Sequence, residues 1–212
     1  MQAPWIVKSD DDMIVNTIAL RNYLQNLESY HERMYSKQQQ DIQQMKKKHP
    51  ELATNIDALV DQLISEQMYT KKKENFVLPK KLDKIMCAVW YGMPVLRGKG
   101  CAKWCVSNEE WPYKSYPPYC SGSAFLVPTH QAPKLFKAYF KSRFLWVDDA
   151  YVSGVLSQTA GVKHKAIYSL YELNHFLIEK NLIRGNRLFC HHPGNATKRA
   201  KWWSIIAKKE GA

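Results

Sequence analysis

The sequence has no apolar run that approaches the roughly 20 residues needed to span a bilayer. It also has no signal peptide, because Lys8 and the acids Asp10 to Asp12 follow Met1 almost at once. Residues 5–7 nevertheless form a short apolar run typical of a buried strand in the middle of a sheet. Such a strand needs neighbours on both sides, and few residues precede it. We therefore expect a chain that is truncated at its N-terminus.

Cysteine is scarce, and its number is odd. The five cysteines are Cys87, Cys101, Cys105, Cys120 and Cys190. A zinc knuckle needs two matched cysteine pairs, and the Cys101–Cys105 pair has no second pair to match it. The pattern favours disulfides in a secretory lumen with one cysteine left over, or reduced thiols.

Acidic residues are also few, with 19 Asp and Glu against 31 Lys and Arg, so the net charge is +12. This balance attracts polyanions, including nucleic acid, acidic glycans, anionic membrane surfaces and phosphorylated donors. The 45% hydrophobic content, with 7 Trp and 12 Tyr, indicates a folded protein. At 212 residues, the chain is long enough for one domain or a domain with an appendage.

Two groups of carboxylates follow short apolar runs. Asp10, Asp11 and Asp12 follow residues 5–7 after two intervening residues, and Asp148 and Asp149 come directly after residues 144–147. Three adjacent carboxylates repel one another, and a hard divalent cation would remove that conflict. The alternatives are a solvated turn for the triplet and helix N-caps for the pair.

The segment from about 29 to 81 differs in composition from the rest of the chain. Helical spacing over 18–27 is followed by glutamine and lysine runs, and an apolar stripe from Leu52 to Met68 predicts a second helix after Pro50. We expect a basic helical hairpin inserted between core elements. Its two lysine triplets fit either a polyanion patch or a solvated face.

The remaining pattern predicts alternating strands and helices. Residues 14–15 continue apolar, and we expect strands over 85–90, 103–107 and 124–127 and a helix over 133–144 with Leu135, Phe136 and Phe140 facing inward. A helix should begin near Asp148 and close at residues 160–162. A short strand should end at His191 and His192, followed by a final basic helix that carries Trp202 and Trp203.

Four separated segments match one family in order: Lys8 to Asn16 (K-S-D-D-D with a following V-N), Lys103 to Ser107 (K-W-C-V-S), Tyr116 to Gly122 (Y-P-P-Y-C-S-G) and Asp148 to Gly154 (D-D-A-Y-V-S-G). The chain resembles the β1,3-galactosyltransferase family, glycosyltransferase family 31, which also contains β1,3-N-acetylglucosaminyltransferases and fringe-type enzymes. The resemblance implies an α/β fold of the glycosyltransferase-A type, a Rossmann-like sandwich. Residues 1–212 would be its C-terminal part, with residues 29–81 as an insertion. The membrane anchor and the nucleotide-binding half would be absent.

The resemblance also implies roles for particular residues. Asp149 would be the general base that deprotonates the acceptor hydroxyl. Mn²⁺ would be held by members of one set: Asp10, Asp12, His191 and His192. The UDP-sugar would be bound by another set: Lys8, Tyr116, Tyr119, Gly122 and Asp148. Asp148 and Ala150 depart from the family's usual Glu and Val at these positions.

The implied function is that of a metal-dependent inverting hexosyltransferase in protein glycosylation. It would move a galactose- or N-acetylglucosamine-type sugar from a UDP-sugar to a glycan, glycoprotein or glycolipid hydroxyl in β1,3 linkage. The family implies the luminal face of the Golgi membrane, reached through an anchor outside this chain. One alternative is a truncated fragment or pseudoenzyme that binds sugar or a partner without turnover. The other is a basic nucleic-acid binder, which the resemblance argues against.

Overall fold

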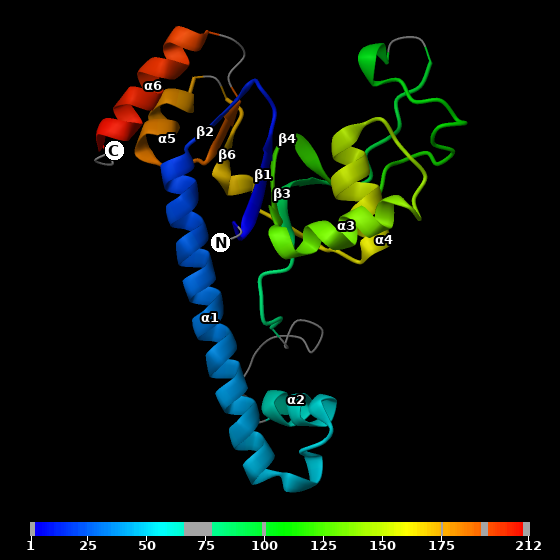
Figure 1. Cartoon of the computed structure of the whole chain (residues 1–212), viewed down its shortest axis with the longest axis vertical. Coiled ribbons are helices and arrows are strands. Elements are labelled where there is room, and N and C mark those ends of the chain that lie inside the picture. Colours follow the sequence, from blue (N-terminus) through cyan, green and yellow to red (C-terminus); the bar gives the residue numbers. More distant parts are fainter. Residues whose placement is uncertain (1–2, 66–77, 99–100, 175, 192–194, 210–212) are drawn as a thin grey trace. The chain divides into compact units, whose positions relative to one another are not determined.

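The computed structural model describes residues 3–65, 78–98, 101–174, 176–191 and 195–209. The chain divides into two compact units. The core unit comprises Met1–Arg21 and Asp83–Ala212, and the helical unit comprises Asn22–Leu82. All strands of the described chain belong to the core unit (Figure 1).

The first sheet of the core unit has the strand order β1-β4-β3-β5. Its strands are β1 (Trp5–Ser9), β4 (Tyr119–Pro128), β3 (Ile85–Trp90) and β5 (His164–Ala166). Both β1 and β3 run antiparallel to β4, whereas β5 is parallel to β3. The strands predicted over 85–90 and 124–127 are confirmed. The prediction that residues 5–7 lie in mid-sheet is wrong, because among the described residues β1 pairs only with β4, and Ile6 and Val7 are exposed.

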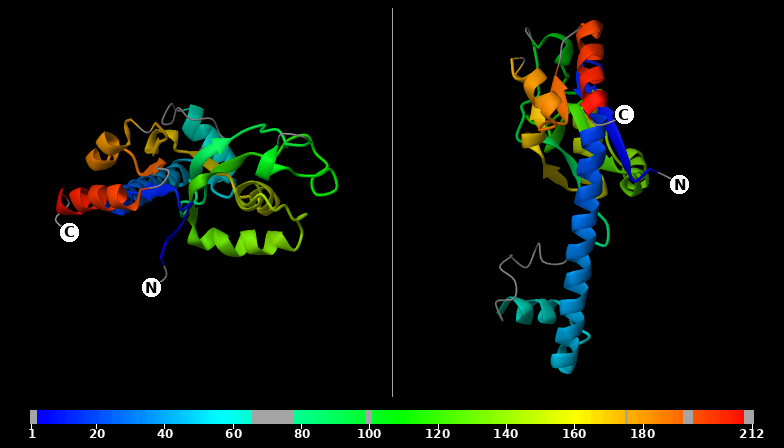
Figure 2. Two further views of the ribbon diagram at one scale, coloured as in Figure 1. Left: turned by 90° about the horizontal axis from the view of Figure 1, so that it is seen from above. Right: turned by 90° about the vertical axis from the view of Figure 1, so that its left-hand side faces the viewer.

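The second sheet has the order β2-β7-β6, formed by β2 (Met13–Val15), β7 (Phe189–His191) and β6 (Tyr171–Glu172). Strand β2 is antiparallel to β7, and β6 is parallel to it. Helices α5 (Ile178–Arg184) and α6 (Ala196–Lys209) cover this sheet (Figures 1 and 2). Their contacts with it form one apolar cluster of Ile178, Leu182, Cys190, Trp202 and Ile206. The predicted strand that ends at the histidines and the final basic helix are therefore confirmed.

The helices beside the first sheet are α3 (Ala132–Tyr139), a π-helix (Ala150–Leu156) and α4 (Ser157–Ala160). They share the main core with strands β3 and β4. Short 3₁₀ turns occupy Ala102–Trp104, Thr129–Gln131 and Tyr168–Leu170. Gly161, with a φ of 67°, ends α4 where the sequence predicts it. The fold is mixed α/β, with parallel and antiparallel pairs in both sheets.

Two local predictions are wrong. Residues 103–107 form no strand, because the Trp104 N–H donates to the Cys101 carbonyl oxygen at 3.0 Å and closes a 3₁₀ turn. The helix predicted over 133–144 ends at Tyr139, and Phe136 and Phe140 face outward. Leu135 faces inward as predicted, and Ala138, three residues later on the same side of the helix, completes the inner face.

The helical unit contains most of α1 (Thr17–Lys48), a 3₁₀ turn (Pro50–Leu52) and α2 (Ile56–Ser65). Its core consists of Ile42, Met45, Leu59, Val60 and Leu63. The predicted helix over 18–27 is confirmed, but it continues without a break to Lys48. Met68 lies outside the described residues, and the origin of this unit as an insertion stays a prediction. No helix in the described ranges is both long and apolar enough to cross a membrane.

The sequence leaves open whether the cysteines form disulfides or stay reduced, and the structure has two disulfides. Cys87–Cys120 joins the adjacent strands β3 and β4, and Cys101–Cys105 closes a local loop. Cys190 is a buried free thiol, and burial raises its pKa to about 12. Because the thiolate is the reactive form, Cys190 should be inert in the folded protein.

We therefore expect one reactive thiol per chain after denaturation without reductant, and five after reduction. Titration with Ellman's reagent measures both values. More than one reactive thiol in the unreduced, denatured chain would contradict the disulfide assignment.

Candidate functional site

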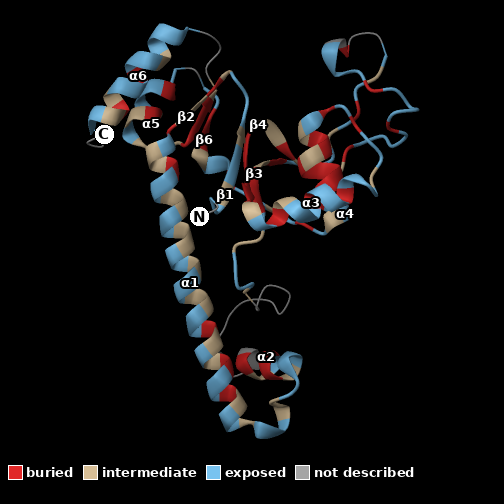
Figure 3. Ribbon diagram, in the orientation of Figure 1, coloured by how far each residue is buried: buried red, intermediate tan, exposed pale blue. Residues whose placement is uncertain are grey.

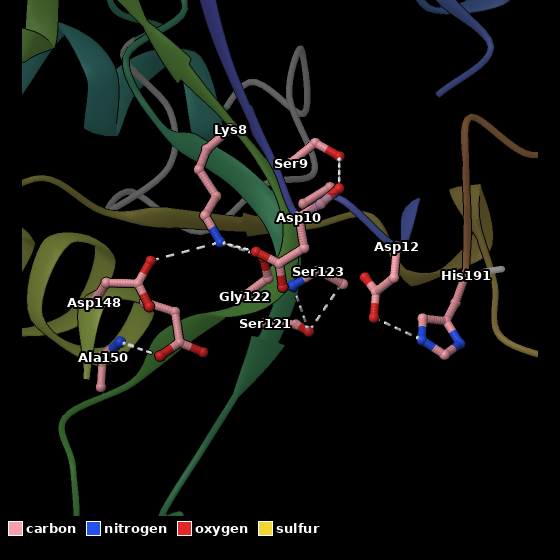
Figure 4. A network of polar contacts seen from close by, with 12 residues as sticks. Lys8, Ser9, Asp10, Asp12, Ser121, Gly122, Ser123, Asp148, Ala150 and His191 are labelled. Atoms are coloured by element: carbon pink, nitrogen blue, oxygen red, sulfur yellow. Dashed lines mark hydrogen bonds and ion pairs between the residues drawn. The ribbon is translucent and has the colours of Figure 1, made fainter. Parts of the chain in front are cut away.

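The antiparallel pairing of β1 with β4 determines where the acidic triplet lies. Ser9 pairs with Ala124, and the Asp10 N–H donates to the Ser123 carbonyl oxygen at 3.0 Å. The carboxyl end of β1 therefore meets the amino-terminal half of β4, beside Gly122. Two motifs more than a hundred residues apart come together at this point (Figure 4).

Lys8 links three of the predicted motifs through one ammonium group. Its Nζ lies 2.5 Å from Asp10 Oδ1, 2.5 Å from the Gly122 carbonyl oxygen and 3.6 Å from Asp148 Oδ2 (Figure 4). Asp10 and Asp148 are both exposed, so solvent screens these ion pairs and limits their contribution to stability. The main effect of these ion pairs is to hold the end of β1 beside the start of the π-helix.

Asp149 is packed against the backbone of β4. Its Oδ1 accepts a hydrogen bond from the Ala150 N–H at 2.8 Å, so it does cap the π-helix, as the simpler prediction requires. A Cβ added at Gly122 would lie 3.0 Å from Asp149 Oδ2, closer than a side chain normally approaches. Glycine at position 122 therefore lets the carboxylate reach the strand.

The surroundings of Asp149 raise the pKa of its carboxyl group. Burial is the main cause, because it disfavours the charged form, and the negative charge of Asp148 adds to it. Hydrogen bonds to the backbone of Ala150 and Gly122 and the charge of Lys8 act in the opposite direction. The net result is a carboxylate more basic than an exposed aspartate, as general-base catalysis requires.

Ser153, four residues after Asp149, joins the π-helix to β4 by hydrogen bonds. Its buried hydroxyl accepts from the Cys120 N–H at 2.8 Å and donates to the Asp149 carbonyl oxygen at 2.6 Å. The His164 Nε2 lies 2.6 Å from the Ser153 carbonyl oxygen, and burial lowers the pKa of His164. Because a carbonyl only accepts, Nε2 carries the proton in this contact.

Sequence reasoning missed both Ser153 and His164. The available signal was the position of Ser153 four residues after Asp149, a spacing at which a serine hydroxyl can bond to a carbonyl of the preceding turn. Gly154 adds a second close approach, since a Cβ there would lie 3.0 Å from Tyr119 Cβ.

The two predicted sugar-binding tyrosines differ in accessibility. Tyr116 is buried and packs near Trp111, which is the packed turn of the simpler interpretation. Tyr119 is less buried, and its ring meets that of Tyr116 edge to face at 5.8 Å. Burial, reinforced by Asp149, raises the pKa of Tyr119 to about 12, so its hydroxyl is protonated at neutral pH. Contact of either ring with a sugar stays a prediction.

The predicted metal ligands are only partly brought together. Asp12 Oδ2 lies 3.1 Å from His191 Nε2, because β2 pairs with β7 in a register that places Met13 opposite His191 (Figure 4). Asp10 faces Lys8 instead, and His192 lies outside the described residues. Within the described ranges, no group of three or more His, Cys, Asp or Glu is arranged for a metal. A facing carboxylate and imidazole nevertheless fit two ligands of Mn²⁺.

Comparison with known proteins gives one consistent result. The family model described as Galactosyltransferase matches residues 52–167, more than half of the chain. Beta-1,3-galactosyltransferase 1 of Mus musculus and of Homo sapiens are each 24% identical over 109 residues, which is 51% of this chain and 32% of each relative. Beta-1,3-galactosyltransferase bre-2 of Caenorhabditis elegans is 28% identical over 82 residues, 38% of this chain and 23% of its own length.

The matches cover only part of the candidate site and only part of the relatives. The range matched by the family model includes Gly122, Asp148 and Asp149, but neither the acidic triplet nor His191. The aligned chain spans about a third of the length of the mammalian relatives it matches.

The Ser153 bridge yields a stability prediction. Ser153→Ala leaves the Cys120 N–H without its side-chain partner, and an unsatisfied buried donor costs about 1–3 kcal/mol of unfolding free energy. Urea denaturation measures the loss. Ser157→Ala is the matched control, because the Ser157 hydroxyl contacts the Val152 carbonyl oxygen at a long 3.4 Å. Equal losses in the two variants would show that the bridge contributes nothing specific.

Proposed function

The chain belongs to the galactosyltransferase family, and from this premise we propose that it forms part of an inverting β1,3-glycosyltransferase. The enzyme transfers a galactose- or N-acetylglucosamine-type sugar from a UDP-sugar to a glycan hydroxyl. Its whole catalytic domain has the glycosyltransferase-A fold, to which this mixed α/β chain contributes the part that carries Asp149. The activity depends on Mn²⁺.

One observation carries the proposal. Asp149, from the motif that the family model includes, is a partly buried carboxylate with a raised pKa next to the glycine of a second motif. A partly buried carboxylate beside exposed ones is the arrangement expected where one carboxylate serves as the base and the others serve as ligands.

In the proposed reaction, the Asp149 carboxylate accepts the proton of the acceptor hydroxyl. The hydroxyl oxygen forms a bond to the anomeric carbon as the bond from that carbon to the UDP oxygen breaks, which inverts the configuration. The electron pair of the broken bond leaves with UDP. Lys8 and the backbone of Gly122 keep the carboxyl end of β1 beside the base, and Ser153 orients the segment that carries it.

The residues that would hold Mn²⁺ are Asp12 and His191, with the donor diphosphate completing the coordination. When bound, the cation neutralises the diphosphate and stabilises the departing nucleotide as a Lewis acid. Asp10, the other described ligand that the resemblance implies, forms an ion pair with Lys8 in this structure. His192, Asp148, Tyr116 and Tyr119 keep the donor-site roles that the resemblance implies.

The proposed setting is the luminal face of the Golgi membrane, with glycoprotein or glycolipid acceptors in protein glycosylation. The two disulfides support an oxidising compartment. Attachment through a membrane anchor outside these residues belongs to the same proposal, and nucleic acid has no part in it.

A second candidate is a pseudoenzyme that binds a sugar or a partner without turnover. The observation that favours it is the two-member ligand set in the described part of the chain, with Asp10 engaged by Lys8. The two candidates separate in an assay of the longest natural polypeptide that contains these residues. Transfer from any member of a UDP-sugar panel supports the enzyme, and saturable UDP binding without transfer or hydrolysis supports the pseudoenzyme.

Replacing the proposed base tests the reaction. Asp149→Asn keeps the side-chain volume but removes the basic oxygen, so turnover should fall by about 10²-fold or more. Donor binding, measured by calorimetry, should stay unchanged. Asp57→Asn, in the helical unit, is the control and should retain full turnover. Full activity in Asp149→Asn would show that another group accepts the proton.

The pH dependence tests the electrostatics around the same carboxylate. Because Asp149 acts as a base, kcat/KM should rise with pH until its carboxyl group is deprotonated. Asp148→Asn removes a negative neighbour, lowers the pKa of Asp149 and should move the acidic limb of the profile to lower pH. Lys8→Met removes a positive neighbour and should move the limb to higher pH. Shifts in the same direction would contradict this account.

A further inference from the structure

Four aromatic side chains project from α3 and the turn that follows it. Phe136, Tyr139, Phe140 and Phe144, here called the aromatic face, are 66%, 50%, 71% and 64% exposed. Their outward position is the reverse of the inward packing predicted for Phe136 and Phe140. The ribbon of α3 shows buried and exposed residues along the same helix (Figure 3). Leu135 and Ala138 occupy the buried side of α3, so its exposed aromatic residues form a second apolar surface beside the core-facing one. A second apolar side is unusual for a surface helix, and exposed apolar patches mark interaction sites.

Positive charge accompanies the aromatic face. Lys134, Lys137, Lys141 and Arg143 alternate with the aromatic residues and are all exposed. The sequence has no Asp or Glu between residues 111 and 147. Arg143 donates to the Glu109 carbonyl oxygen at 2.6 Å, which places it toward the neighbouring loop and at the border of the patch. The charge therefore complements an anionic partner.

Ring geometry distinguishes between classes of anionic partner. Phe136 and Phe140 meet at 5.4 Å with an interplanar angle of 88°, and Tyr139 and Phe140 at 5.2 Å with 86°. Such edge-to-face clusters present a mixed apolar surface, not the parallel flat faces on which bases stack. Three of the four rings are Phe, which has no polar atom to bond a sugar hydroxyl.

We propose that the aromatic face and its lysines form a peripheral binding site for an anionic lipid surface. The Phe rings enter the boundary between headgroups and acyl chains, as the apolar side of an interfacial helix does. The lysine stems extend along the apolar surface while their ammonium groups reach the lipid phosphates. This site lies in the core unit and does not depend on the proposed transferase activity.

Vesicle flotation of the 212-residue chain tests the proposal. The chain should float with vesicles of phosphatidylcholine and phosphatidylserine, and not with phosphatidylcholine alone. Phe136→Ser and Phe140→Ser should each weaken the affinity by about tenfold, because a buried Phe side chain is lost. Lys137→Glu should weaken it by about fivefold or more at low salt.

Matched controls lie elsewhere on the core unit. Phe176→Ser removes a ring that is even more exposed, and Lys180→Glu makes the same charge change on α5. Both should bind vesicles as the parent chain does. Equal losses in the controls, or equal binding to neutral and anionic vesicles, would overturn the proposal. A third outcome would also overturn it. In this outcome the chain does not float with vesicles but binds heparin or self-associates, and Phe136→Ser abolishes that binding or association.

Discussion

The close approach of the Asp149 carboxylate to the backbone of Gly122 is the constraint on which the site depends. A Cβ at position 122 would lie 3.0 Å from Asp149 Oδ2 and crowd the carboxylate, so glycine there favours the approach, as does the packing of the π-helix against β4. Ser153 and Gly154 provide that contact, one through hydrogen bonds at both ends of its hydroxyl and the other through its lack of a side chain. The burial that results raises the pKa of the Asp149 carboxyl group.

The other acids of the site are accessible to solvent, and the roles proposed for them differ from that of Asp149. Asp10 and Asp148 share Lys8, and Asp12 faces His191, while each of the three carboxylates keeps substantial solvent contact. An exposed carboxylate can exchange its partner for a cation at little desolvation cost. Burial thus distinguishes Asp149 from the other three carboxylates, as the proposed division between one base and several ligands requires.

Sequence patterns predicted where the strands and helices lie better than they predicted which elements pack against one another. Residues 85–90, 124–127 and 189–191 form strands as expected, and Asp149 lies at a helix start. The contact of Asp12 with His191 joins residues 179 positions apart, and only the resemblance suggested it. Local periodicity could not reveal that β1 lies at a sheet edge, or that Leu135 and Ala138 alone fill the inner side of α3. Both depend on which long-range neighbours are present, and so do the Ser153 bridge and the Cys87–Cys120 disulfide.

The central claim is that Asp149 is the base that faces the acceptor in a UDP-sugar transferase. A crystal structure of the Asp149→Asn variant with Mn²⁺, a UDP-sugar and an acceptor glycan tests it most directly, because slow turnover preserves both substrates. The account predicts an acceptor hydroxyl about 3 Å from the residue 149 side chain, within reach of proton transfer. It also predicts manganese at Asp12 and His191, located by its anomalous scattering. An acceptor hydroxyl that faces a different group, or a metal bound elsewhere, would contradict it.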